Sequence, residues 1–253
     1  MRLKKKIALI TGAGSGIGRS TAMCFAAEGA IIMAADINET EAVITQELIE
    51  QAGGKCRALA FDVSKELEVK DAIALTVSMF GRLDIMHNNA GISIIKPTTE
   101  ITEADLNRLI GINFKGVFFG CKHAIAQMVK QQEGVIINTA SELAIVGQPL
   151  YSAYCGTKGA VIAMTRALSA EWAKQGIRVN ALCPGPINTP MLQAEFNLAT
   201  NPKVEAQAAV DSIPAGKLGT PEEIAKVALF LASDNAQFVH GAAIMVDGGK
   251  TII

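Results

Sequence analysis

Short apolar runs alternate with helix-length amphipathic segments along the whole chain, and this alternation constrains the fold more than any other feature of the sequence. The runs are rich in Ile, Val, Leu and Ala, which is typical of parallel strands buried on both faces. The alternation predicts an α/β fold in which a doubly wound parallel sheet is covered by helices on both sides, in three layers. Seven strands are expected, over residues 6–11, 30–36, 56–61, 84–87, 134–140, 177–183 and 242–246.

Helices are expected between these strands. The clearest cover residues 17–28, 39–52, 65–80, 103–130, 152–174 and 221–232, the last with Thr220 as its N-cap. No linker, repeat or low-complexity tract divides the 253 residues, so one domain over residues 1–253 is predicted.

The segment 188–215 departs from the alternation because it is long, contains prolines and has only weak helical periodicity. Connections of this length usually cover a site or bind something. We therefore expect a substrate-loop insertion here.

Charge and composition exclude several classes of function. The formal net charge is -1 and no Lys/Arg-rich stripe is present, so neither nucleic acid nor an anionic membrane is an expected partner. No run approaches the roughly 18 consecutive apolar residues of a membrane span. The five cysteines are scattered without a C-x-x-C pair, which favours a reducing, cytoplasmic compartment. The three histidines are far apart without metal-ligand spacing, so no metal is expected.

A glycine-rich turn follows the first predicted strand directly, in the segment Thr11-Gly12-Ala13-Gly14-Ser15-Gly16-Ile17-Gly18. Glycines here permit a tight turn and let backbone N–H groups approach a pyrophosphate at the positive end of the following helix. The spacing is T-G-x-x-x-G-x-G instead of G-x-G-x-x-G. Strand, turn and helix together predict a dinucleotide cofactor.

Asp36 ends the second predicted strand, where a carboxylate accepts hydrogen bonds from the hydroxyls of an adenosine ribose. The same carboxylate repels a 2′-phosphate, which would need an Arg or Lys near Ser15 or Ile37, and neither position is basic. The sequence therefore predicts NAD in preference to NADP.

Tyr154 and Lys158 are four residues apart in a predicted helix and share one of its faces. A free tyrosine, with a pKa of about 10, is a poor base, and lowering that pKa by about 3 units takes roughly 4 kcal/mol. A buried ammonium and an oxidised nicotinamide, both cationic, would supply this stabilisation. The spacing alone occurs by chance in many helices, so the pair needs support from other residues.

Six motifs in order supply that support: the glycine turn, Asn88-Asn89-Ala90-Gly91, Asn113, Ser141 thirteen residues before Tyr154, the Y-x-x-x-K pair, and Pro184-Gly185. Over the whole chain this combination resembles the classical short-chain dehydrogenase/reductase family. The resemblance implies a Rossmann-type seven-stranded sheet and NAD(H)-dependent hydride transfer between a secondary alcohol (a CH-OH donor) and a ketone. It also implies a homotetramer, because residues 242–249 are similar to the segment that the family uses in a subunit contact.

The resemblance further implies residue roles. Tyr154 would be the general acid/base, Ser141 would orient the substrate oxygen, Lys158 would hold the nicotinamide ribose and depress the Tyr154 pKa, and Asn113 would anchor a water of the proton relay. The implied cofactor contacts are Gly12, Ser15, Gly16, Ile17, Gly18, Asp36, Asp62, Val63, Asn89, Tyr154, Lys158, Ile187 and Thr189.

Two alternative functions stay open. Tyr151 lies seven residues before Lys158, which is the spacing of the divergent enoyl-reductase branch that reduces a C=C bond. The offset of Ser141 and the type of glycine turn favour Tyr154. A catalytically inactive dinucleotide-binding regulator is the second alternative, and the presence of all four catalytic residue types at these spacings argues against it.

The substrate is only outlined by the sequence. Apolar residues expected in loops at the carboxyl ends of strands suggest an uncharged, fairly apolar substrate; they are Ile92, Ile94, Ile95, Leu143, Val146, Met191, Leu192 and Phe196. Nearby Lys96, Glu142 and Gln148 leave room for a polyol or an acyl thioester. The reaction direction and stereochemistry stay open.

Overall fold

The structure is a computed structural model that describes residues 1–252, and its centre is a sheet of seven parallel strands. The strands are β1 (Ile7–Thr11), β2 (Ile31–Asp36), β3 (Lys55–Ala60), β4 (Ile85–Asn88), β5 (Gly134–Thr139), β6 (Ile177–Pro184) and β7 (Ala243–Val246). Their order in the sheet is β3-β2-β1-β4-β5-β6-β7, and every neighbouring pair is parallel. Each predicted strand lies within one residue of an observed one at both ends, so the predicted fold class is confirmed.

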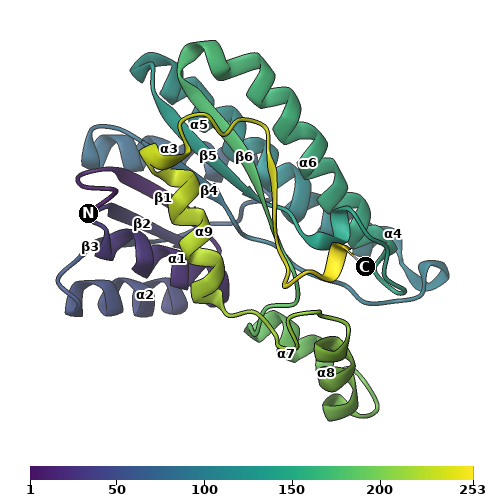
Figure 1. Cartoon of the computed structure of the whole chain (residues 1–253). Helices are drawn as coiled ribbons and strands as arrows, with labels where there is room; N and C mark the ends of the chain where they lie inside the picture. Colours follow the sequence, from purple (N-terminus) through teal and green to yellow (C-terminus); the bar gives the residue numbers. More distant parts are fainter. Residues whose placement is uncertain (253) are drawn as a thin grey trace.

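Helices cover both faces of the sheet (Figure 1). One face carries α1 (Gly16–Ala27), α2 (Glu39–Gln51) and α9 (Pro221–Ala232); the other carries α3 (Glu66–Phe80), α5 (Val117–Gln131) and α6 (Ser152–Trp172). Successive strand residues point to opposite faces. In β1, for example, Ala8 and Ile10 join the core beneath α1 and α9, whereas Leu9 joins the core beneath α3, α5 and α6.

The strand order places a crevice at one edge of the sheet. From β1 the chain winds outward through β2 to β3. It then returns to β4, on the other side of β1, and winds outward to β7, so the direction of winding reverses between β1 and β4. Ligands in such sheets bind outside the carboxyl ends of the strands at this switch point. The glycine turn follows β1, Asn89 follows β4 and Ser141 follows β5, so the fold brings all three to the same edge.

The long helix predicted over residues 103–130 is interrupted in the structure. α4 (Glu103–Ile110) passes into a π-helical turn, Gly111–Gly116, before α5 begins. A π-turn contains an extra residue, and such turns often occur at functional sites. The extra residue here presents Asn113 to the backbone of Ile92, which it both donates to and accepts from. The prediction of one continuous helix was therefore wrong at this point.

The segment 188–215 forms two short helices, α7 (Pro190–Phe196) and α8 (Pro202–Asp211), which weak periodicity did not predict. Each begins with a capping side chain followed by proline: Thr189 accepts from the N–H of Leu192, and Asn201 accepts from that of Val204. Figure 1 shows both helices standing away from the sheet. The remaining short 3₁₀ turns are Thr98–Glu100, Glu142–Ala144, Ala173–Gln175, Asp234–Ala236 and Lys250–Ile252.

Candidate active site

A cavity of about 910 Å³ lies at the carboxyl ends of the strands, between the glycine turn, α6 and the α7–α8 segment. Most of the predicted site residues line it, namely Gly12, Ser15, Gly16, Ile17, Asp36, Asp62, Val63, Asn89, Ser141, Tyr154, Lys158, Ile187 and Thr189. Gly18 and Asn113 are buried and do not line the cavity. The sequence motifs therefore converge on one space.

The glycine turn is held against the loop after β4. Gly12 has a φ of 64°, and a Cβ there would lie 2.9 Å from the α-carbon of Ala90. A Cβ on Gly18 would lie 2.0 Å from the carbonyl oxygen of Gly12, so only glycine lets α1 start this close to β1. Ser15, the N-cap of α1, makes no side-chain capping bond, which leaves the first N–H groups of the helix without that partner.

Asp36 is fixed at the end of β2 by two backbone donors. The N–H of Gly14 donates to Oδ2 and the N–H of Asn38 donates to Oδ1, each at 2.9 Å. Arg19, which the sequence motifs did not point to, also approaches this region. Its guanidinium donates to the carbonyl of Gly14 and to Glu41 Oε2, the latter at 2.6 Å. The nearest basic group on α1 is thus already neutralised by a carboxylate.

Lys158 and Tyr154 lie one turn apart on α6, as predicted. The Lys158 side chain is only 3% exposed, its Nζ donates to the carbonyl of Thr139 at 2.8 Å, and Nζ lies 5.7 Å from the centre of the Tyr154 ring. Ser141, which follows β5, lies near enough to Tyr154 for a hydrogen bond from its side chain to lower the Tyr154 pKa, and its Oγ accepts from the N–H of Leu143 at 3.1 Å. Three of the four predicted catalytic side chains therefore form one cluster.

Asn113 supports this cluster from behind. Its Oδ1 accepts from the N–H of Ile92 at 2.9 Å, and its Nδ2 donates to the Ile92 carbonyl at 2.8 Å and to Thr157 at 3.3 Å. A Cβ placed on Gly91 would lie 3.4 Å from Asn113 Oδ1 and 3.5 Å from Lys158 Nζ. Asn113 and Lys158 therefore flank the same glycine.

Burial and nearby carboxylates set the proton affinities of the cluster. Burial raises the pKa of Tyr154, the hydrogen bond from Ser141 lowers it, and the charges of Glu195 and Glu142 raise it further. Burial lowers the pKa of Lys158 to about 8. A low-dielectric site thus disfavours both the phenolate and the ammonium, and each charge gains from the other.

Tyr151 points to a different partner. Its hydroxyl donates to Glu195 Oε2 at 2.8 Å, while its ring meets that of Tyr154 edge-on with 6.1 Å between centres. Ser93 donates to the other oxygen of Glu195. Burial, followed by the charge of Glu195, raises the pKa of Tyr151. The two tyrosines therefore share a wall of the cavity but bond to different groups.

A buried ion pair forms another part of the wall. Lys250 Nζ donates to Glu142 Oε1 at 3.1 Å and to Gln148 Oε1 at 3.2 Å. Burial raises the pKa of Glu142 to about 7, against the lowering effect of Lys250, and Glu142 Oε2 is buried without a hydrogen-bond partner among the described residues. Glu142 and Gln148 were expected near the pocket from the sequence, whereas Lys250 and Glu195 were not.

The apolar lining agrees in part with the sequence expectation. The cavity is lined by Ile92, Ile95, Leu143, Met191, Leu192 and Phe196. Ile94 and Val146 are absent from the lining, and Lys96 instead pairs with Asp105 at 2.7 Å.

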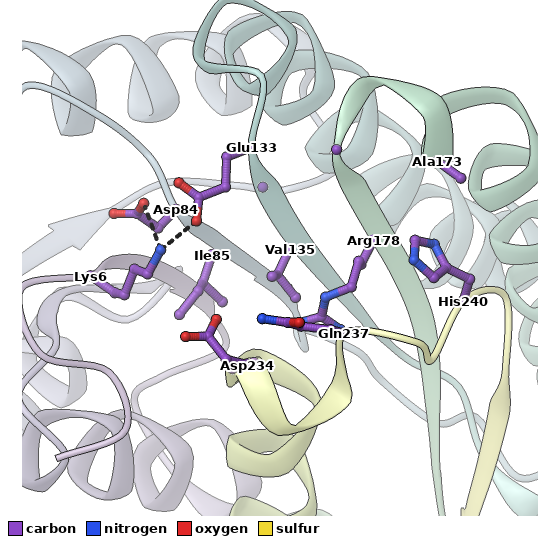
Figure 2. A pocket seen from close by; sticks show the side chains of 13 residues that line it. Lys6, Asp84, Ile85, Glu133, Val135, Ala173, Arg178, Asp234, Gln237 and His240 are labelled. Atoms are coloured by element: carbon purple, nitrogen blue, oxygen red, sulfur yellow. Dashed lines mark hydrogen bonds and ion pairs between the residues drawn. The ribbon is translucent and has the colours of Figure 1, made fainter.

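A second cavity, of about 270 Å³, lies at the opposite edge of the sheet (Figure 2). Most of its charged groups pair with one another or with backbone: Lys6 Nζ lies 2.6 Å from Glu133 and 3.8 Å from Asp84, and Arg178 donates to the carbonyl of Leu231 at 2.8 Å. Lys6, Asp84 and Glu133 directly precede β1, β4 and β5, so this cavity lies at the amino ends of the strands and the candidate active site is the larger cavity at their carboxyl ends.

Within residues 1–252, no group of three or more His, Cys, Asp or Glu side chains is arranged to hold a metal ion. No helix in the same range is both long and apolar enough to cross a membrane.

Comparison with known proteins identifies the family. The family model described as enoyl-(acyl carrier protein) reductase matches residues 12–251. An uncharacterized oxidoreductase of Thermotoga maritima is 41% identical over 253 residues, and a 3-oxoacyl-(acyl-carrier-protein) reductase of the same organism is 38% identical over 252 residues; each alignment covers 100% of both chains. The crystal structure of levodione reductase superimposes with a TM-score of 0.97 at 35% identity, covering 99% of each chain. The chain therefore belongs to the classical short-chain dehydrogenase/reductase family of nicotinamide-dinucleotide oxidoreductases.

Proposed function

We propose that the protein is an NAD(H)-dependent dehydrogenase that interconverts a secondary alcohol and a ketone, with Tyr154 as the general acid/base. The observation that carries this proposal is the cluster of Ser141, Tyr154 and Lys158 in the same cavity as the glycine turn and Asp36. A proton-transfer group and a dinucleotide cradle thus open onto one space, as hydride transfer requires.

The residues of the cavity fit a nicotinamide dinucleotide. The start of α1 presents backbone N–H groups and a positive helix end to a pyrophosphate. Asp36, held by Gly14 and Asn38, offers acceptor oxygens to the adenosine ribose, and Glu41 neutralises Arg19. These groups support NAD over NADP because the Asp36 carboxylate would repel a 2′-phosphate and the nearby Arg19 is paired with Glu41.

Residues of the protein would transfer the proton of the substrate hydroxyl. A bound nicotinamide dinucleotide would supply the hydride acceptor or donor. The hydroxyl of Ser141 would fix the substrate oxygen beside the Tyr154 phenol, which takes the alcohol proton during oxidation and returns it during reduction. The Lys158 ammonium stabilises the phenolate, and Asn113 holds the π-turn and the loop at Ile92 beside that ammonium. We propose that a water near Asn113 continues the relay.

The contacts of Tyr151 weigh against the enoyl-reductase alternative. Its hydroxyl is bonded to Glu195, whose negative charge opposes formation of a second phenolate. Tyr154 instead has Ser141 as its hydroxyl partner and the Lys158 ammonium near its ring. This difference supports reduction of C=O over reduction of C=C.

The test is NADH formation from a panel of secondary alcohols, with ketones and enoyl thioesters assayed in the reverse direction. Tyr154→Phe should abolish turnover while NAD binding, followed by calorimetry, stays close to wild type. Tyr151→Phe, the matched control, should keep most of kcat. Loss of activity only in Tyr151→Phe, or turnover of enoyl thioesters alone, would favour the enoyl reductase. Tight NAD binding without turnover of any substrate would favour the inactive regulator.

We also propose a cytoplasmic homotetramer. β7 is an edge strand, and its apolar Ile244, Met245 and Val246 are only half-buried, as is typical of a strand that another subunit covers. Phe238, in the loop before β7, is fully exposed. The free cysteines fit a reducing compartment. Light scattering should give four times the chain mass, and a monomer would contradict this proposal.

A further inference from the structure

Charged side chains from distant segments line the cavity near Tyr154, and besides Glu205 on α8 they include three from well-separated parts of the chain. Glu142 follows β5, Glu195 lies on α7, and Lys250 lies in the 3₁₀ turn near the end of the chain. All three line the same cavity as Tyr154. The apolar residues described above form only part of the wall, so the site is built to meet polar groups as well.

Glu195 presents a carboxylate close to the reacting position. Each of its oxygens accepts one hydroxyl hydrogen bond, from Tyr151 at 2.8 Å and from Ser93. Because Tyr151 packs edge-on against Tyr154, this carboxylate is near enough for its charge to act on the Tyr154 phenol. A carboxylate oxygen accepts more than one hydrogen bond, so Glu195 has capacity left for a substrate hydroxyl.

Lys250 presents a donor on another part of the wall. An ammonium has three N–H donors, and Lys250 directs two of them to Glu142 and Gln148. The third has no acceptor among the described residues and is available to a ligand. The side chain is 16% exposed, so a bound substrate without a polar group here would leave this donor poorly solvated.

Building on the proposed alcohol oxidation, we propose that the substrate is a neutral polyhydroxylated alcohol, such as an acyclic polyol. One carbinol lies at Ser141 and Tyr154, while neighbouring hydroxyls donate to Glu195 and accept from Lys250. A hydroxyl can donate and accept, and this wall offers both kinds of partner. Glu195 and Lys250 each attract one sign of charge and repel the other, so a neutral molecule with several hydroxyls meets both groups without repulsion.

The experiment compares erythritol with sec-butanol, which has the same carbon-chain length but a single hydroxyl, at saturating NAD. Erythritol should have a kcat/KM about 100-fold higher, because the monoalcohol leaves buried polar groups unpaired. Glu195→Gln and Lys250→Met should each lower the erythritol/sec-butanol ratio of kcat/KM by about tenfold, mainly through the KM for erythritol. Glu171→Gln, an exposed carboxylate on α6, should leave the ratio unchanged.

The outcomes separate this inference from the function on which it rests. Equal or faster turnover of sec-butanol, with an unchanged ratio in both variants, would overturn the polyol assignment while leaving Tyr154-dependent alcohol oxidation intact. No turnover of any alcohol or ketone with either nicotinamide cofactor would overturn the proposed function and the polyol assignment together.

Discussion

Replacing Lys158 with methionine tests the central electrostatic claim about the active site. Nζ lies 5.7 Å from the centre of the Tyr154 ring. If this length is taken as the separation of the two charges, the ammonium stabilises the phenolate by about 3 kcal/mol at an effective dielectric constant of about 20. That energy corresponds to about 2 pKa units. Lys158→Met should therefore raise the pKa of Tyr154 by about 2 units and lower kcat/KM for alcohol oxidation at neutral pH about 100-fold.

The assay is the pH profile of kcat/KM for alcohol oxidation. Tyr154 must be deprotonated to act as the base, so a higher pKa moves the rise of the profile to higher pH, and activity should recover as the pH increases. Lys158→Arg, which keeps a positive charge, should shift the profile much less. A uniform loss in Lys158→Met at every pH, with an unchanged midpoint, would refute the electrostatic explanation and leave Lys158 only a positioning role.

Two further substitutions test other parts of the structure. Asp36→Ser should lower the NAD/NADP ratio of kcat/KM by about 100-fold, because hydrogen bonds from the ribose to a charged carboxylate are lost and repulsion of a 2′-phosphate is removed. An unchanged ratio would contradict the assignment of Asp36. The control is Glu47→Ser, on the exposed side of α2. Burial lowers the pKa of His87 from 6.5 to about 3, so the unfolded chain binds the extra proton first and stability falls as the pH drops from about 6.5 towards 3. Urea unfolding across this range should show a smaller loss in His87→Gln than in wild type, and parallel pH curves would contradict this reasoning.

The sequence predicted the sheet well because the signal for each strand is local. A run such as Ile7–Thr11 is buried on both faces, and its apolar character is visible without knowledge of its neighbours. The glycine turn was equally readable, since Gly12 and Gly18 occupy positions where a Cβ would collide with backbone. The alternation of strands and helices predicted a doubly wound parallel sheet, whereas the strand order and the position of the switch point came from the structure.

The features that the sequence did not predict depend on contacts between distant residues. The π-turn depends on Asn113 meeting the Ile92 backbone, and the ion pair of Glu142 with Lys250 joins residues 108 positions apart. Contacts of this kind leave no periodic pattern of hydrophobic residues in the sequence. The α7 and α8 helices, in contrast, have local signals in the sequence, because Thr189 and Asn201 are N-cap residues that are each followed by proline. They were not predicted because the hydrophobic periodicity of the segment is weak.

Glu195 and Lys158 carry opposite charges near Tyr154, and Glu195 is proposed to affect both the Tyr154 pKa and the binding of a polyol. The carboxylate of Glu195 raises the pKa of Tyr154, whereas the ammonium of Lys158, 5.7 Å from the ring centre, would stabilise its phenolate in the proposed mechanism. Glu195→Gln should therefore move the pH profile of alcohol oxidation to lower pH, the reverse of the shift expected for Lys158→Met. The same variant should bind a polyol less well, because a neutral amide is a weaker acceptor than a carboxylate. A lower Tyr154 pKa together with poorer polyol selectivity in the same variant would show that Glu195 favours its substrate at the expense of Tyr154 ionisation, and a shift to higher pH would contradict the placement of its charge beside the phenol.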